Sequence, residues 1–167
     1  MNYVRRLLVT AGLVAAMAFS AMAQDKAGVI TAAGSKLGPL PGLPTCLTLS
    51  AQRGDPSKGS SVILIKMTSG CTVPWHWHTA GEALMFVSGK GKLEMKDATP
   101  ASSAVAPGDY VYLPGKHTHQ FSCASSCTFF NVIEGAFDIH YVDKDGKEIT
   151  PDQALGATKK PAVTPKK

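Results

Sequence analysis

Short apolar runs recur along most of this chain, and each is followed by Gly, Pro, Asp or Ser. Their lengths suit strands, and no segment before Asp152 keeps the spacing of an amphipathic helix. Many short strands at such intervals are typical of a sandwich or barrel, because each strand must bury one face against another sheet. The chain is therefore predicted to be all-β, with one helix candidate at 151–155 that Thr150 could cap. The clearest predicted strands are 47–51, 61–67, 82–87, 92–95, 110–113, 128–133 and 137–142.

The chain is long enough for one packed domain, and its charge distribution excludes nucleic acid as a partner. Its 167 residues carry a formal charge of +5, from 17 Lys and Arg against 12 Asp and Glu. The basic excess lies at the two ends, so residues 24–157 are close to neutral and contain a single arginine, Arg53. Nucleic-acid binding needs clustered basic residues, and recognition of polyanions usually recruits arginine. Small neutral or weakly acidic molecules are the favoured ligands.

Residues 1–23 contain the three parts of a secretory signal peptide. Arg5 and Arg6 give the positive start, 7–19 the apolar stretch, and 21–23 the small-x-small cleavage site. The apolar stretch is shorter than the roughly 20 residues that span a bilayer. We therefore expect a periplasmic or secreted protein with no membrane segment in its mature form. Residues 24–44 are predicted to form an N-terminal arm, 45–157 the β-barrel domain, and 158–167 a disordered basic tail.

All four cysteines lie in the predicted mature chain, and an oxidising compartment favours disulfide bonds between them. Cys123 and Cys127 flank a short loop between two apolar runs, and Cys46 and Cys71 flank a strand–turn–strand segment. These positions favour pairing Cys46 with Cys71 and Cys123 with Cys127. That pairing is one of three connectivities, and buried free thiols are the alternative.

Four of the five histidines form two His-x-His pairs, His76 with His78 and His117 with His119. Residues two apart point to the same face of a strand, so each pair can present two imidazoles to one interior point. Glu82 follows His78 closely enough to return a carboxylate to that point. Three imidazoles and a carboxylate suit one divalent transition metal ion (Fe, Mn, Ni, Cu, Co or Zn) with positions left for water or substrate. The alternative is a set of structural histidines around an empty barrel; the isolated His140 is predicted to be a surface strand residue.

At these residues the sequence resembles the cupin superfamily. The first cupin motif is Gly, five residues, His-x-His, three or four residues, Glu, six residues, Gly, and it is matched without a gap by Gly70, His76, His78, Glu82 and Gly89. The second motif is matched by Gly108, Pro114 and His119, whereas Lys116 replaces its second glycine and Cys123 its asparagine. The resemblance implies a single-domain antiparallel jelly-roll β-barrel. It also implies that the metal ligands are His76, His78, Glu82 and His119, and that a homodimer paired through sheet edges is the expected assembly.

Two further expectations concern the interior of the barrel. Leu84, Phe86, Val111, Leu113 and Phe121 share the parity of the proposed ligands and are expected to line an apolar cavity. His117 is expected to hydrogen-bond to a ligand or to act as an acid or base, with a solvent-facing turn position as the alternative.

The resemblance fixes a site and leaves the reaction open, because cupins include dioxygenases, oxalate-degrading enzymes, isomerases and ligand-binding regulators. The favoured interpretation is an exported metal-dependent oxidoreductase of dioxygenase type that acts on a small organic molecule, with Glu82 or His117 moving protons. One alternative is a metal-dependent isomerase or lyase with the same ligands. The other is a non-catalytic binding protein for a small chelating ligand or for the metal itself.

Overall fold

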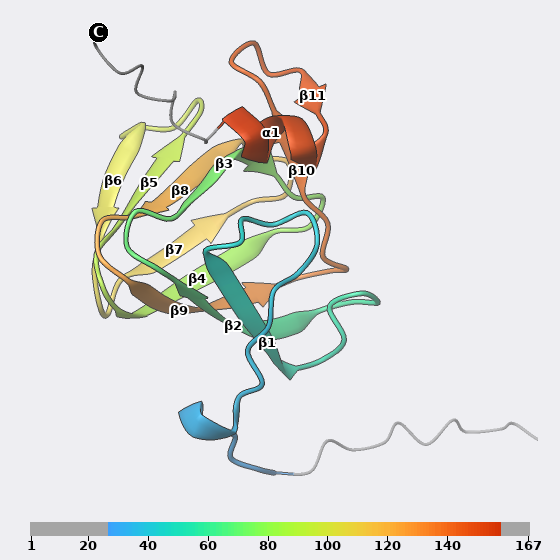
Figure 1. Ribbon diagram of the computed structural model, residues 1–167, viewed down its shortest axis with the longest axis vertical. Coiled ribbons are helices and arrows are strands. Elements are labelled where there is room, and N and C mark those ends of the chain that lie inside the picture. Colours follow the sequence, from blue (N-terminus) through green and yellow to red (C-terminus); the bar gives the residue numbers. More distant parts are fainter. Residues whose placement is uncertain (1–26, 158–167) are drawn as a thin grey trace, which may run out of the picture.

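The computed structural model describes residues 27–157, and most of its regular elements are strands (Figure 1). The predicted signal peptide (1–23) and basic tail (158–167) lie outside the described residues. No helix within 27–157 is both long and apolar enough to cross a membrane. In chain order the elements are η1 (Ala32–Gly34), β1 (Leu47–Arg53), β2 (Ser61–Met67), β3 (Thr72–Trp77), β4 (Glu82–Ser88), β5 (Gly91–Met95), β6 (Ser102–Val105), β7 (Tyr110–Leu113), β8 (His119–Cys123), β9 (Cys127–Ile133), β10 (His140–Val142), β11 (Glu148–Ile149) and α1 (Pro151–Ala157).

The strands form two antiparallel sheets of the jelly-roll type that face each other (Figure 1). One sheet has the order β1-β2-β9-β4-β7, and the other has the order β11-β10-β3-β8-β5-β6. Neighbours in space are often distant in sequence, as when β9 lies between β2 and β4. The all-β, jelly-roll prediction is confirmed.

The core fills the space between the two sheets, and it follows the alternation of each strand. In β9 every second residue is buried, beginning with Cys127 and ending with Ile133. Phe129 from this series meets Phe86 and Phe121, with ring centroids 5.0 and 5.4 Å apart. The first pair is stacked and the second is edge-to-face, and such aromatic contacts add stability beyond simple burial of area.

Each of the seven predicted strands has a counterpart in the structure, whereas η1, β6 and β11 were not predicted. The sequence of β6, Ser-Ser-Ala-Val, has no apolar alternation. The predicted strand 137–142 begins only at His140, and residues 137–139 form a connection across the end of the barrel. The helix is confirmed at 151–157, and Thr150 and Gln153 cap its first turn with reciprocal side-chain hydrogen bonds.

Both predicted disulfide bonds are present, and one of them lies two residues after the N-terminal arm. Cys46 pairs with Cys71, at the loop that enters β3, and Cys123 pairs with Cys127 across the β8–β9 turn. The arm is held where the Tyr141 hydroxyl donates a hydrogen bond to the Gly42 carbonyl at 2.9 Å. Burial raises the pKa of Tyr141 to about 12, so this phenol stays protonated as a donor. The arm is therefore fastened against the sheet that carries the histidines.

Candidate metal centre

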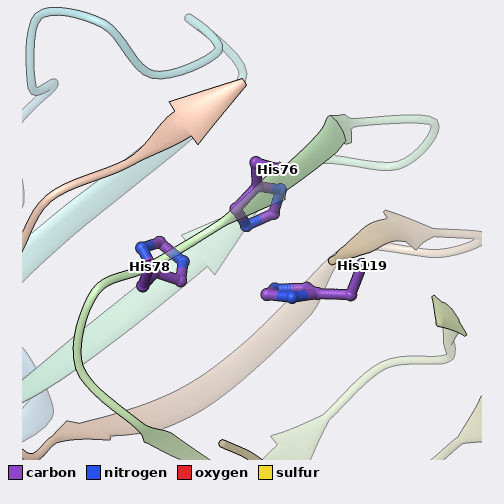
Figure 2. A group of neighbouring side chains, drawn as sticks. All are labelled: His76, His78 and His119. Atoms are coloured by element: carbon purple, nitrogen blue, oxygen red, sulfur yellow. The ribbon is translucent and has the colours of Figure 1, made fainter. Parts of the chain in front are cut away.

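Three histidines converge between the sheets (Figure 2). One lies on β3, one lies just beyond the end of β3, and one lies on β8. His76 and His119 are directly opposed in the antiparallel β3–β8 pair, with ring centroids 4.2 Å apart. His78 follows two residues after His76, just beyond the last residue of β3. One ring nitrogen from each histidine lies within 4.8 Å of the others, and all three residues are buried. We call His76, His78 and His119 the histidine triad.

A β-bulge turns His76 toward this point. The β3–β8 register shifts between Val73 and His76, so both residues are buried although they are three positions apart. Pro74 lies inside the bulge, where its missing N–H costs no sheet hydrogen bond. The parity expected for a regular strand therefore applies to His76 and His78, but not to the residues before Pro74.

Each ring of the triad is oriented by a backbone carbonyl. Nδ1 of His76 donates to the Pro74 carbonyl at 2.6 Å, and Nδ1 of His119 donates to the His117 carbonyl at 2.9 Å. Nδ1 of His78 donates to the carbonyl of Asp138. A carbonyl can only accept, so Nδ1 of each ring carries a proton, and Nε2 is the ring atom that a metal ion would bind. Three Nε2 atoms that face one point form the donor set of a metal site.

Glu82 contacts two members of the triad. Its Oε1 lies 3.1 Å from Nε2 of His119 and 3.6 Å from Nε2 of His78, and the carboxylate is 4% exposed. Burial pushes the pKa of Glu82 upward, but the hydrogen bond to His119 and the nearby imidazoles outweigh it and hold the pKa at about 2. Burial also lowers the pKa of His76 well below its usual value, helped by His119 and His78. The site thus favours an anionic carboxylate beside a neutral imidazole of His76.

Asn131 on β9 is a buried polar residue of the site that we did not predict from the sequence. Its Nδ2 donates a hydrogen bond to Oε2 of Glu82 at 2.6 Å, so the two oxygens of this carboxylate have different partners. The β4–β9 register pairs Asn131 with Leu84, which makes Asn131 a diagonal neighbour of Glu82. The available signal was a polar residue at an inward position of an apolar strand.

The structure does not bring the His117 ring into the site. Its imidazole is absent from the described cavity wall and from the triad, and its backbone carbonyl is what orients His119. His140 lies on the opposite face of its strand from Tyr141, where its ring stacks on Trp77 with centroids 3.9 Å apart. His140 and Trp77 therefore face away from the triad.

The two departures in the second cupin motif are accommodated locally. Lys116 takes the place of a glycine and adopts a φ of 65°, in the left-handed region that favours glycine. Its N–H donates to the His78 carbonyl at 2.7 Å, which fixes the loop before His119. A side chain at Gly115 would meet the backbone of Thr79, so only glycine fits there. Cys123, at the asparagine position, is held by its disulfide to Cys127.

The triad opens on a small apolar cavity of about 60 Å³. This is far below the roughly 300–1,000 Å³ of pockets for drug-sized ligands. Leu84 and Phe121 line it as expected, whereas Phe86 and Leu113 lie deeper in the core and Val111 is half-buried against it. Beyond the triad, Glu82 and Asn131, the wall is wholly apolar: Leu43, Leu47, Leu49, Ile63, Ile65, Val73, Leu84, Phe121, Phe129, Ile133, Phe137 and Ile139.

This set of donors fits a divalent transition metal ion. Three imidazole rings and a carboxylate lie together in a buried site, and borderline metals prefer such nitrogen and oxygen ligands. The backbone carbonyls behind the rings supply the outer hydrogen bonds that metal-ligating histidines usually have. The three histidines of the triad form one close group, and Glu82 contacts two of them.

Comparison with known proteins agrees with the motif analysis. A family model described as a cupin domain matches residues 63–133, a stretch that contains the triad and Glu82. No curated protein matches the sequence.

Similar solved structures include several cupins. An RmlC-like cupin protein from Ralstonia eutropha JMP134 is 20% identical, with a TM-score of 0.59, over 85% of this chain and 93% of that chain. KdgF from Halomonas sp. is 12% identical, with a TM-score of 0.54, over 65% and 94% of the two chains. The DMSP lyase DddQ from Ruegeria pomeroyi DSS-3 is 19% identical, with a TM-score of 0.50, over 74% of this chain and 60% of that chain. At these identities the likeness establishes the fold alone.

Proposed function

The chain is a member of the cupin superfamily, and on that premise we propose that it is an exported metal-dependent oxidoreductase of dioxygenase type. The observation that carries the proposal is the triad itself, three buried imidazoles whose Nδ1 atoms are held by backbone carbonyls, which leaves Nε2 of each ring for a metal ion. We assign His76, His78, His119 and Glu82 as the residues that would hold one divalent ion. When bound, the ion would supply Lewis acidity or an attachment point for dioxygen.

The residues around the triad support chemistry on a small and largely apolar substrate. An apolar wall lowers the local dielectric, which strengthens electrostatic interactions inside the cavity. Asn131 fixes Oε2 of Glu82, and Oε1 faces two rings of the triad, so this carboxylate is the acidic group placed at the site. We therefore assign proton transfer to Glu82, while His117 orients His119 through its carbonyl.

Export is supported by the two disulfide bonds, which persist in oxidising compartments. The predicted cleavage after Ala23 gives this part of the proposal a direct test. Sequencing the N-terminus of the protein recovered from the periplasm or medium should give Gln24 as the first residue. A protein that begins at Met1 would contradict export by this signal.

The oxidoreductase assignment is tested with iron(II) and nitric oxide, a dioxygen analogue that binds open positions on iron. Iron(II)-loaded protein that is treated with nitric oxide in the absence of oxygen should give the half-integer high-spin EPR signal of an iron–nitrosyl centre. A His140→Ala variant should give the same signal, because His140 lies on the outer face of β10. Absence of the signal from iron-loaded protein would contradict oxygen use. Protein that contains zinc when purified from its own compartment, and consumes no oxygen, would instead favour the isomerase, lyase or ligand-binding alternatives.

A further inference from the structure

Asn131 has two functional atoms, and only one of them has a partner. Its Nδ2 donates to Glu82 Oε2 at 2.6 Å, whereas its Oδ1 is buried and has no hydrogen-bond partner. The amide cannot be turned around, because a carboxylate has no hydrogen to offer the amide oxygen. The unpaired acceptor is therefore fixed by the contact that holds Glu82.

The unpaired Oδ1 belongs to a residue of the cavity wall, which distinguishes it from an unpaired atom elsewhere in the core. Buried polar groups in proteins are almost always hydrogen-bonded, and a specific exception calls for an explanation. Among the described residues, the only other buried side-chain atom without a partner is Oγ of Ser61, and Ser61 is not part of the cavity wall. Asn131 does belong to that wall, together with the triad and Glu82.

The other polar groups of the wall are already committed. The Nδ1 atoms of the triad bond to carbonyls and its Nε2 atoms face the proposed metal position, while Glu82 is shared between Asn131 and two imidazoles. All remaining wall residues are apolar. Oδ1 of Asn131 is thus the one unused side-chain acceptor among the described residues that line the cavity.

We propose that Asn131 is a specificity-determining residue whose Oδ1 accepts a hydrogen bond from an N–H or O–H group of a small, largely apolar molecule bound at the metal. This inference rests on the proposed metal centre and extends it to the class of ligand. It predicts discrimination against otherwise equal molecules that lack the donor, because they would leave Oδ1 buried and unpaired.

Three small imidazoles provide the test. Each binds a metal through one ring nitrogen, and they differ in whether the other ring nitrogen carries a hydrogen. Imidazole and 4-methylimidazole keep an N–H donor, whereas 1-methylimidazole has the size of the second and no donor. Titrations of cobalt-loaded protein, followed by visible absorption, should give a Kd for 1-methylimidazole that is about fivefold weaker than that for 4-methylimidazole. Equal affinities of the two methylated probes would overturn the inference and leave the metal centre intact.

Two variants assign the effect to Asn131. Leucine has nearly the same shape as asparagine, so Asn131→Leu removes the amide and keeps the size of the side chain. This variant loses the hydrogen bond to Glu82, so it should need saturating cobalt for loading. The difference in Kd between the two methylated probes should disappear. The control Ser61→Ala removes the other unpaired buried oxygen, and the difference should persist. A difference that survives in Asn131→Leu contradicts the inference. Failure of the wild-type protein to bind cobalt would refute both the inference and the proposed function. If Asn131→Leu does not fold, the comparison of the two methylated probes in wild-type protein remains decisive.

Discussion

Replacing His119 and His117 by alanine, one at a time, separates a proposed metal ligand from its orienting neighbour. His119 presents Nε2 to the site, with Oε1 of Glu82 at 3.1 Å, whereas His117 contributes only its carbonyl. The His117→Ala variant keeps that carbonyl. We therefore expect His117→Ala to bind metal as the wild-type protein does and His119→Ala to lose most of its affinity.

The magnitude follows from mass action. A metal ion that binds only the folded state, at a free concentration 100-fold above its Kd, stabilises that state by about 2.7 kcal/mol. For a domain of this size each kcal/mol raises Tm by roughly 3–4 °C, so added metal should raise Tm by about 8–11 °C. His119→Ala also removes a buried ring, so its Tm falls for reasons of packing as well. The difference in Tm between metal-loaded and metal-free protein isolates the ligand effect.

The assay is a thermal unfolding scan of each protein after chelation, with and without added zinc or cobalt. Wild-type protein and His117→Ala should show the full rise, and His119→Ala should show little or none. An undiminished rise in His119→Ala would remove His119 from the ligand set. Loss of the rise in His117→Ala would place the His117 ring among the ligands, contrary to its position in the structure.

Three further predictions concern stability. The folded-state pKa of His76 lies below its ordinary value of 6.5, so neutral His76 stabilises metal-free protein fully above that pH. This contribution should be lost as the pH falls to about 5, and urea unfolding above pH 6.5 and at about pH 5 measures the loss. Phe129→Ala should cost about 3–5 kcal/mol in urea unfolding, whereas Thr128→Ala, on the outer side of β9, should change stability by less than about 0.5 kcal/mol. Replacing Cys46 and Cys71 together by serine should cost about 3.5 kcal/mol, from the 25-residue separation that the bond closes; an unchanged unfolding midpoint would contradict this.

The sequence was sufficient where a single strand decides the outcome. The His-x-His spacing predicted that His76 and His78 share a face, and the parity of the proposed ligands predicted that Leu84 and Phe121 line the cavity. Both disulfides followed from the positions of their cysteines beside predicted strands.

Features that depend on pairing between distant strands were not predictable in the same way. Asn131 contacts Glu82 only because β9 pairs with β4, and no local pattern reports that register. The segment 137–139 looked like a continuous strand, but it leaves the sheet to cover the cavity, where the Asp138 carbonyl orients His78. The small size of the cavity likewise follows from side chains of the arm and of this segment, whose position the sequence alone does not specify.

Anomalous diffraction at the absorption edge of the metal, from crystals of metal-loaded protein, would locate the ion itself. We predict one strong peak per chain, within about 2.0–2.2 Å of Nε2 of His76, His78 and His119. A protein that takes up no ion, or a peak at a place where these three nitrogens do not reach it, would contradict the account.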